Sequence, residues 1–467
     1  MITSPPRRVI MVVLDGAPYD TTAALLAAGE LPALEQIAVD GSFRMATTVF
    51  PSTTGPAYVP FLTGAFPGSA NIPGFRWFER DGCARQTRPR HRCRSYLGAQ
   101  CALINRDLAA PYTTLFESLP ISIAINSFIT RGSALRHTPS AYSYARSLLT
   151  SQWLDFDSHL RDVLLDSVHK NFTSIVCVLL AIDKFSHECG PFSEATVRAY
   201  RSCDGIIAAL VSLLKRIGKY EETLLLVTSD HGHSSTDHHF DICGALAAMG
   251  YRVISHPLIR PRPDADAAVM ISGNAFCQIY FRMGGLWDTP VDLEDLDHVV
   301  AQLLPHPAID IVAGRRRDGW IGVLSRHGCA AIRMRGDDIE YKALRGDPFG
   351  YPRMGASINA QAAWQTTVDA EYPDGIVQVA QLFRSARTGD LVLSAAPGYD
   401  FRRFELRGHV SSHGSLRADH MLVPLFCNRR IEADTVRSVD IHASVVRTMT
   451  GQNGHREGDG RPFTIAW

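Results

Sequence analysis

The amino-acid sequence predicts an α/β fold with a doubly wound, mostly parallel central sheet and helices on both faces. Short apolar runs rich in leucine and β-branched residues alternate with amphipathic stretches through the first half of the chain, as in βαβ units. Three of these runs end at or just before an aspartate, namely Asp15, Asp183 and Asp230. Buried parallel strands deliver their last residues to the carboxyl edge of the sheet, where open α/β folds place their chemistry.

The predicted elements follow one another in regular order. A strand over residues 9–14 precedes a helix over 21–39 with leucines spaced to face the core. Further strands are predicted at 121–129, 174–182 and 223–228. Between the last two, residues 193–217 have the amphipathic pattern of a long helix, capped by Ser193.

The alternation breaks between about residue 241 and residue 388. This stretch holds scattered prolines, an acidic run at 292–297 and three consecutive arginines at 315–317. We expect residues 241–388 to be an inserted cap or specificity region on a core made of residues 1–240 together with 389–467. The core is expected to resume with a strand at 390–394 and to end with a short helix and a turn.

Charge and hydropathy exclude several classes of protein. The 467 residues include 47 basic and 47 acidic side chains, so the charge balance indicates neither a nucleic-acid polymer nor a membrane surface as partner. No apolar run approaches the roughly 18 residues that span a bilayer. The basic segment 85–94 could face a polyanionic substrate, a neighbouring subunit or solvent. Its one nearby aromatic, Tyr96, gives no base-stacking pattern, and nothing predicts a particular oligomeric state.

Cysteine usage predicts a reducing compartment. The ten cysteines are scattered without a C-x-x-C pair. Residues 1–8 pass straight into the first strand, without the apolar core and cleavage site of a signal peptide. We therefore expect a cytoplasmic protein.

Two of the strand-end aspartates are paired with a histidine. His187 lies four residues after Asp183, His231 directly follows Asp230, and His413 supplies another imidazole. A lone aspartate after a strand is more often a helix cap or turn residue, and a lone histidine is more often hydrogen-bonded in a core. Together these side chains offer the mixed oxygen and nitrogen ligands that suit zinc. Their convergence favours a metal centre.

Several short motifs run in a fixed order along the chain. They are Leu14-Asp15-Gly16, Phe50-Pro51-Ser52-Thr53-Thr54-Gly55-Pro56-Ala57, Thr63-Gly64 with Pro67, Asp183-x-x-x-His187, Ser229-Asp230-His231-Gly232, Ser412-His413-Gly414, Val439-Asp440-Ile441 and Asp459-Gly460-Arg461-Pro462. In this order they resemble the alkaline phosphatase superfamily, and most of all its nucleotide pyrophosphatase/phosphodiesterase branch. The resemblance reaches both ends of the chain, where the last two motifs would be the family's last strand, helix and turn.

The resemblance implies an enzyme with two divalent metal ions, expected to be Zn2+, that acts on a small-molecule phosphoester. One ion would be held by Asp183, His187 and His413, and the other by Asp15, Asp230, His231 and the oxygen of Thr54. Thr54 would also be the nucleophile and carry a phospho-threonine intermediate. Two ions about 4 Å apart can stabilise the attacking and leaving oxygens of an in-line displacement, and a threonine hydroxyl needs such activation. The alternatives for Thr54 are a helix cap and a nucleophile displaced to Thr53 or Ser52.

One departure from the branch concerns the substrate. The branch usually places an asparagine about 21 residues beyond the nucleophile, but counting from Thr54 reaches Phe75. Asn71 and Arg76 are therefore the candidates for substrate binding. Arg76 would suit a doubly charged monoester group, because a guanidinium pairs two oxygens at once.

Three functions compete. The leading one is a phosphodiesterase or nucleotide pyrophosphatase, and the second is a phosphate monoesterase, phosphonate hydrolase, sulfatase or phosphomutase of the same superfamily. A sulfatase needs C-x-P-x-R, of which residues 54–58 keep only the proline. The third is a non-catalytic binding protein, against which the intact ligand set argues. His233, His238 and His239 are expected behind the ligands or at the surface, and His409 in a loop outside the ligand set.

Overall fold

The computed structural model describes residues 6–80, 93–256, 262–355, 357–402, 409–452 and 458–467. The first of its two large sheets has eight strands in the order β22-β2-β21-β8-β1-β7-β5-β6. Strand β21 runs antiparallel to both of its neighbours, and the other pairs are parallel. The strands are β1 (Arg8–Leu14), β2 (Ser42–Thr47), β5 (Ser122–Ile125), β6 (Leu135–His137), β7 (Ser174–Leu179), β8 (Thr223–Thr228), β21 (Leu422–Cys427) and β22 (Thr435–Arg437).

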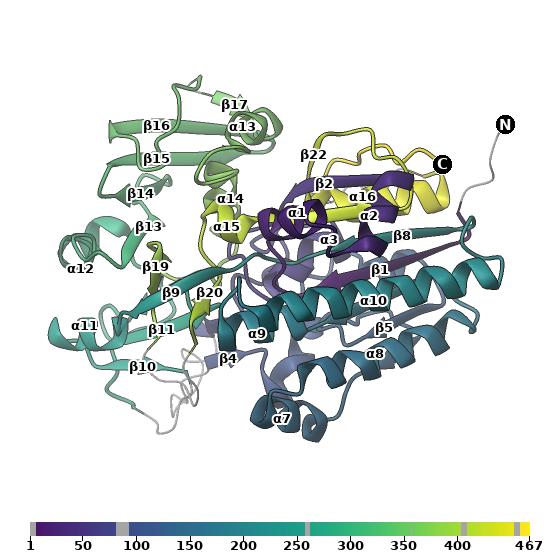
Figure 1. Cartoon of the computed structure of the whole chain (residues 1–467). Coiled ribbons are helices and arrows are strands. Elements are labelled where there is room, and N and C mark those ends of the chain that lie inside the picture. Colours follow the sequence, from purple (N-terminus) through teal and green to yellow (C-terminus); the bar gives the residue numbers. More distant parts are fainter. Residues whose placement is uncertain (1–5, 81–92, 257–261, 356, 403–408, 453–457) are drawn as a thin grey trace.

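Helices cover both faces of this sheet (Figure 1), and the predicted α/β fold class is confirmed. On one face, α8 (Trp153–Val168), α9 (Ala181–Cys189) and α10 (Glu194–Arg216) pack against one another. On the other face, α3 (Val59–Thr63) packs against α16 (Ser438–Thr450). The apolar residues of β1 are fully buried between these layers, and burial of each large aliphatic side chain contributes about 1.5–3 kcal/mol. Within the described ranges, no helix has the length and apolar character to cross a membrane.

The second sheet has nine strands in the order β10-β11-β12-β18-β13-β14-β15-β16-β17 and is antiparallel apart from the β10–β11 pair. Figure 1 shows it beside the first sheet, with α11 (Ile242–Ala248) and α12 (Asp297–Leu303) near it. Its strands are β10 (Val253–Ser255), β11 (Ala267–Ser272), β12 (Phe276–Phe281), β13 (Ile309–Arg315), β14 (Ile321–Ser325), β15 (Gly328–Arg335), β16 (Asp338–Gly346), β17 (Ser357–Asn359) and β18 (Leu391–Ala395). Helices α13 (Ala360–Thr367) and α14 (Gly375–Leu382) follow β17.

A short ribbon and two single bridges link the sheets at the end of β8. Strand β9 (Ser234–His239) leaves this end and pairs with β19 (Gly398–Asp400) and β20 (Ser411–Ser412). The residues after β20 then form bridges to both sides, His413 to Asn274 in the β11–β12 turn and Gly414 to Ser52. The ribbon thereby brings His413 to the carboxyl edge of the first sheet.

Two predicted helices have different outcomes. The helix expected over 21–39 is in fact two helices, α1 (Tyr19–Ala27) and α2 (Pro32–Asp40). Gly29 breaks it by adopting a left-handed conformation with φ of 71°, and a proline begins the second helix. The helix α10 is confirmed, and the Oγ of its N-cap Ser193 accepts a hydrogen bond from Thr196 N.

Two predicted strands end early. Strand β5 ends at Ile125, four residues before the expected end. Strand β7 ends at Leu179 instead of residue 182, because the chain turns into helix α9. The buried carboxylate of Asp157 in α8 accepts hydrogen bonds from Leu180 N and Ala181 N, each at 2.9 Å, and so holds the start of that helix.

The strand expected at 390–394 does not rejoin the first sheet. It is β18, which lies in the second sheet between β12 and β13. Its side chains are buried on both faces, with Leu391 and Leu393 in one apolar cluster and Val392 in another, so a central position suits it. The division of the chain into a core of residues 1–240 and 389–467 and an insertion of residues 241–388 stays a proposal. By its residue numbers β18 belongs to the proposed core, but it lies in the second sheet. Residues 439–441, expected as a strand, lie in α16.

Candidate metal centre

Three buried aspartates meet at the carboxyl edge of the first sheet. Asp15 follows β1, Asp230 lies two residues after β8, and Asp183 lies in the first turn of α9 after β7. Strand β1 pairs with both β7 and β8, which sets the three carboxylates side by side. All three side chains are at most 2% exposed. Buried carboxylates in such a group are either neutralised by cations nearby or partly protonated.

The histidines predicted as ligands all hold their rings in the same way. Nδ1 lies 3.2 Å from Ser411 O in His187, 3.0 Å from Gly232 O in His231 and 3.2 Å from Ser52 O in His413. A carbonyl oxygen can only accept, so each Nδ1 carries the proton and each Nε2 presents a lone pair. Metal-binding histidines are oriented in this manner.

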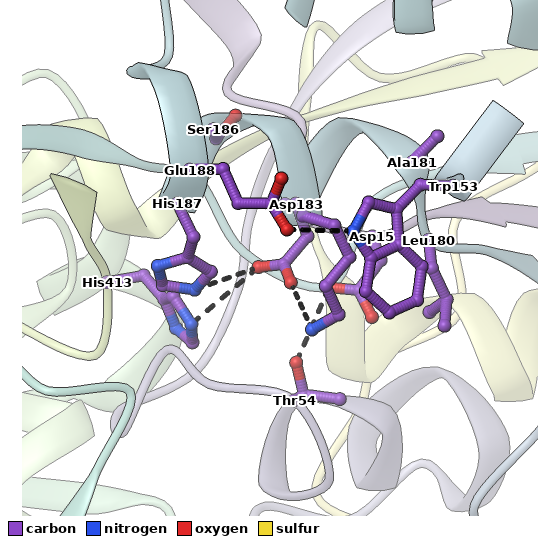
Figure 2. Close-up of polar contacts among 12 residues, drawn as sticks. Asp15, Thr54, Trp153, Leu180, Ala181, Asp183, Ser186, His187, Glu188 and His413 are labelled. Carbon is purple, nitrogen blue, oxygen red and sulfur yellow. Dashed lines mark hydrogen bonds and ion pairs between the residues drawn. The ribbon is translucent and has the colours of Figure 1, made fainter. Parts of the chain in front are cut away.

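The Nε2 atoms point at carboxylate oxygens in two groups. In the first, Nε2 of His187 lies 3.3 Å and Nε2 of His413 3.8 Å from Asp183 Oδ1, as Figure 2 shows. In the second, Nε2 of His231 lies 3.5 Å from Asp15 Oδ1 and 3.4 Å from Asp230 Oδ2.

This arrangement fits metal ions. Lone pairs that face ionised carboxylate oxygens repel unless a cation lies between them, and Asp230 Oδ2 is buried without a hydrogen-bond partner among the described residues. The candidate ligand atoms of Asp15, Asp230 and His231 all lie within 4.8 Å of one another. Carboxylates and imidazoles together suit zinc and other first-row divalent ions.

The ionisation of the buried groups reflects their crowding. Burial, together with the charges of Asp230 and Asp183, raises the pKa of Asp15 well above its ordinary value. Burial also raises the pKa of Asp230. Burial opposes the charge of Asp183 too, but Lys184 and His187 bring its pKa well below the usual range. Burial lowers the pKa of His187, which favours the neutral imidazole that binds metal.

Thr54 is the hydroxyl that contacts the second group. Its Oγ1 lies 3.1 Å from His231 Nε2 and 3.4 Å from Asp15 Oδ1. Ser52 and Thr53 are buried, and Ser52 Oγ donates to a backbone carbonyl at 2.8 Å. The N-cap of the following 3-10 helix (Pro56–Tyr58) is Gly55. The contacts of Thr54 therefore suit a site residue better than a helix cap.

The two predicted substrate-binding residues have other described partners. Asn71 Oδ1 accepts a hydrogen bond from Ser385 Oγ at 2.7 Å. Arg76 Nη1 donates to Ile271 O at 3.0 Å. Phe75, which lies 21 residues after Thr54, packs beside the turn that contains Thr54 and Gly55, since a Cβ on Gly55 would lie 3.2 Å from its ring.

The remaining histidines and the described part of the basic segment 85–94 lie in different parts of the structure. His238 and His239 lie on β9 and are exposed, whereas the ring centre of His409 lies 4.5 Å from that of His187. Of the basic segment 85–94, residues 85–92 lie outside the described residues, and Arg94 pairs with Asp107 at 2.9 Å.

Sequence reasoning missed three residues that contact or position the predicted ligands. Tyr58 donates to Asp15 Oδ2 at 3.0 Å, and Asp157 holds the start of α9. Lys184 donates to Asp183 Oδ2 at 2.8 Å, so one ammonium offsets part of the negative charge of the cluster. The position of Lys184 directly after Asp183 could have indicated its contact with that carboxylate, whereas Tyr58 and Asp157 lie in no recognisable sequence motif.

Comparisons with known proteins identify the family of the chain and its fold. The model of the type I phosphodiesterase / nucleotide pyrophosphatase family matches residues 9–416, although no curated protein matches the chain. Murine ectonucleotide pyrophosphatase / phosphodiesterase 5, solved in an inactive form in complex with AMP, has a TM-score of 0.57 and 14% identity over 97% of both chains. Phosphonoacetate hydrolase from Sinorhizobium meliloti 1021, in complex with phosphonoformate, has a TM-score of 0.59 and 16% identity over 95% of this chain and 96% of that chain. At these identities the likeness shows the fold. The family match shows that the chain belongs to the type I phosphodiesterase/nucleotide pyrophosphatase family, phosphoric ester hydrolases of the alkaline phosphatase superfamily.

Proposed function

We propose that the protein hydrolyses phosphodiester or pyrophosphate bonds through a phospho-threonine intermediate on Thr54, at a site that holds two Zn2+ ions. The observation that carries this proposal is the position of Thr54 Oγ1, 3.1 Å from His231 Nε2 and 3.4 Å from Asp15 Oδ1. It is a partly exposed hydroxyl next to a buried cluster of metal-ligand atoms. A nucleophile needs this combination of access to the substrate and activation by its surroundings.

The contacts of the residues support the roles that we propose for them. Asp183, His187 and His413 would hold one ion, and Asp15, Asp230 and His231 the other. Bound ions would lower the pKa of the hydroxyl and stabilise charge on the attacking and leaving oxygens. The Thr54 oxygen would form the bond to phosphorus as the bond to the leaving group breaks. Water would then release the phosphoryl group from Thr54.

A second candidate is the hydrolysis of a phosphonate or phosphate monoester. Lys184 favours it, because its ammonium lies 2.8 Å from Asp183 Oδ2 and could pair an additional negative charge on the substrate. One structural neighbour is a phosphonate hydrolase by name. Asn71 and Arg76 stay candidates for substrate contact, and each would have to exchange a hydrogen bond within the protein for one to the substrate.

For the cellular compartment, we propose the cytoplasm. The nine cysteines in the part of the chain that the structure describes are all free thiols, which suits a reducing environment. A small-molecule phosphoester is the proposed partner, and AMP and phosphonoformate are the ligands named for two structural neighbours.

A hydrolysis panel tests the proposed function. Zinc-loaded protein is compared on a nitrophenyl phosphodiester, the matching monoester, a phosphonate and a sulfate ester, before and after removal of metal with a chelator. We expect the diester to be hydrolysed fastest, the activity to disappear with the metal and Zn2+ to restore it. Faster hydrolysis of the monoester or the phosphonate would replace the leading function by the second one. Failure to hydrolyse any of the four, with metal bound, would contradict both.

A further inference from the structure

His233 is buried inside the metal centre but has no part in the proposed function. Its Nε2 lies 2.8 Å from Asp183 Oδ1, which is closer than the Nε2 of His187 at 3.3 Å. Its ring centre lies 4.5 Å from that of His187 and 4.8 Å from that of His413. Three imidazole Nε2 atoms thus surround one carboxylate oxygen.

The hydrogen bonds of Ser411 determine which nitrogen of His233 carries the proton. Ser411 Oγ lies 2.7 Å from Ser186 O, and because a carbonyl only accepts, the hydroxyl must donate there. Ser411 has one hydroxyl proton, so it acts as acceptor toward His233 Nδ1 at 3.2 Å. Nδ1 therefore carries the proton of the neutral ring, and Nε2 turns a lone pair toward Asp183.

A lone pair and a carboxylate oxygen at this separation need a cation beside them. Two atoms bound at about 2.1 Å to one ion lie about 3 Å apart at a right angle and about 3.4 Å apart at the tetrahedral angle. The distances of 2.8 Å and 3.3 Å from Asp183 Oδ1 to His233 and His187 are close to these values. The geometry is therefore that of ligands sharing an ion.

The ring of His233 packs so close to the backbone of residue 16 that only glycine fits at that position. Gly16 has φ of +74°, and a Cβ there would lie 2.8 Å from His233 Cδ2 and 2.9 Å from Asp183 Cβ. A glycine after Asp15 is thus required both by its backbone conformation and by the packing of His233 against Asp183.

We propose that His233 Nε2 is a fourth protein ligand of the ion held by Asp183, His187 and His413. This inference rests on the proposed metal centre and makes its two sites unequal. One site would offer three imidazoles and one carboxylate, and the other two carboxylates, one imidazole and a hydroxyl. Because nitrogen ligands favour later first-row metals over the harder ions, the His233 site would be the tighter one for Zn2+ or Co2+.

Cobalt substitution tests the inference without measuring activity. Each imidazole bound to Co2+ gives one hyperfine-shifted, solvent-exchangeable N–H resonance in the proton NMR spectrum. The proposed function predicts three, from His187, His231 and His413, and His233 raises the count to four. In His233→Ala one of the four should disappear, and the affinity for one of the two ions should fall by more than the roughly 10–100-fold expected for a residue that only orients a ligand.

His420 provides a matched control. It is as buried as His233, at 2% exposure each, but its ring nitrogens face the hydroxyls of Ser234 at 2.7 Å and Ser415 at 2.6 Å. His420→Ala should keep all four resonances and both metal affinities. If His233→Ala does not fold, His233→Gln takes its place. The number of shifted resonances in the wild-type protein, four if His233 is a ligand and three if it is not, tests the inference without any variant.

Two results would overturn the inference and one would overturn its basis. Three shifted resonances in the wild type, or four that persist in the His233 variant, would show that His233 does not bind the ion and would leave the proposed function intact. Failure of the protein to bind Co2+ or Zn2+ would contradict the proposed metal centre, and this inference with it.

Discussion

Replacing Tyr58 by phenylalanine tests whether the hydrogen bonds behind the ligands tune the metal centre. Tyr58 is fully buried, and its hydroxyl donates to Asp15 Oδ2 at 3.0 Å. Burial and the nearby carboxylates raise its pKa well above 10, so the hydroxyl stays a donor throughout the accessible pH range. Tyr58→Phe keeps the ring among Phe61 and Phe128 and removes this one hydrogen bond.

A hydrogen bond to a charged group contributes about 1.5–3 kcal/mol, which corresponds to roughly 10–150-fold in an equilibrium constant. Loss of a partner that orients a metal ligand costs about 10–100-fold in affinity. We therefore expect Tyr58→Phe to bind one of the two proposed ions about 10–100-fold more weakly, measured by competition with a chromophoric chelator.

Tyr96→Phe is the control for this experiment. Tyr96 is also fully buried and donates to a carboxylate, Asp107 Oδ2, at 3.3 Å, but Asp107 is not among the proposed ligands. This variant should lose stability and keep both metal affinities. Wild-type affinity for both ions in a folded Tyr58→Phe protein would refute the reasoning.

Three further predictions concern the same centre. Elemental analysis should find about two zinc ions per chain. Asp230→Ala and His187→Ala should each lower this zinc content and abolish most activity. A full zinc content in both variants would contradict the assignment of these residues as ligands. Because the pKa of Asp15 is raised in the folded protein, metal binding should release a proton in the pH range in which Asp15 of the metal-free protein is protonated, and should strengthen as pH rises through that range. Calorimetry in buffers of different ionisation enthalpy measures this release, and a pH-independent affinity would be the contrary result. With a phosphodiester substrate, Asn71→Ala should raise the activation barrier for hydrolysis more than Arg76→Ala does, by about 1–3 kcal/mol. With a monoester substrate the order of the two variants should reverse. If both variants keep rates within about twofold of the wild type, this loop does not line the site.

The parts of the site that were predictable are those in which sequence order determines position. A buried strand followed by an aspartate fixes where the carboxylate lies, because parallel strands end at one edge of the sheet. Asp15 and Asp230 therefore lie where the sequence predicts them. His187 follows from Asp183 because residues four apart share a helix face.

The unpredictable parts depend on contacts between distant segments. His233 could be placed in the cluster only once the ribbon β9–β20 had brought Ser411 beside it. Asp157 carries no motif, and its capping of α9 joins residues more than 20 positions apart. Strand β18 has a core-like sequence that suits either sheet, and only its pairing with β12 and β13 assigns it to the second.

The identity of the nucleophile is the central claim, and trapping the covalent intermediate tests it most directly. Metal-loaded protein is mixed with a nitrophenyl phosphodiester, quenched with acid during turnover and digested for mass spectrometry. We predict a phosphoryl-ester adduct on Thr54, no adduct in Thr54→Ala, a rate at least about a thousandfold lower in that variant, and partial activity in Thr54→Ser. An adduct on Thr53 or Ser52, or near-wild-type turnover by Thr54→Ala with no adduct, would contradict the account.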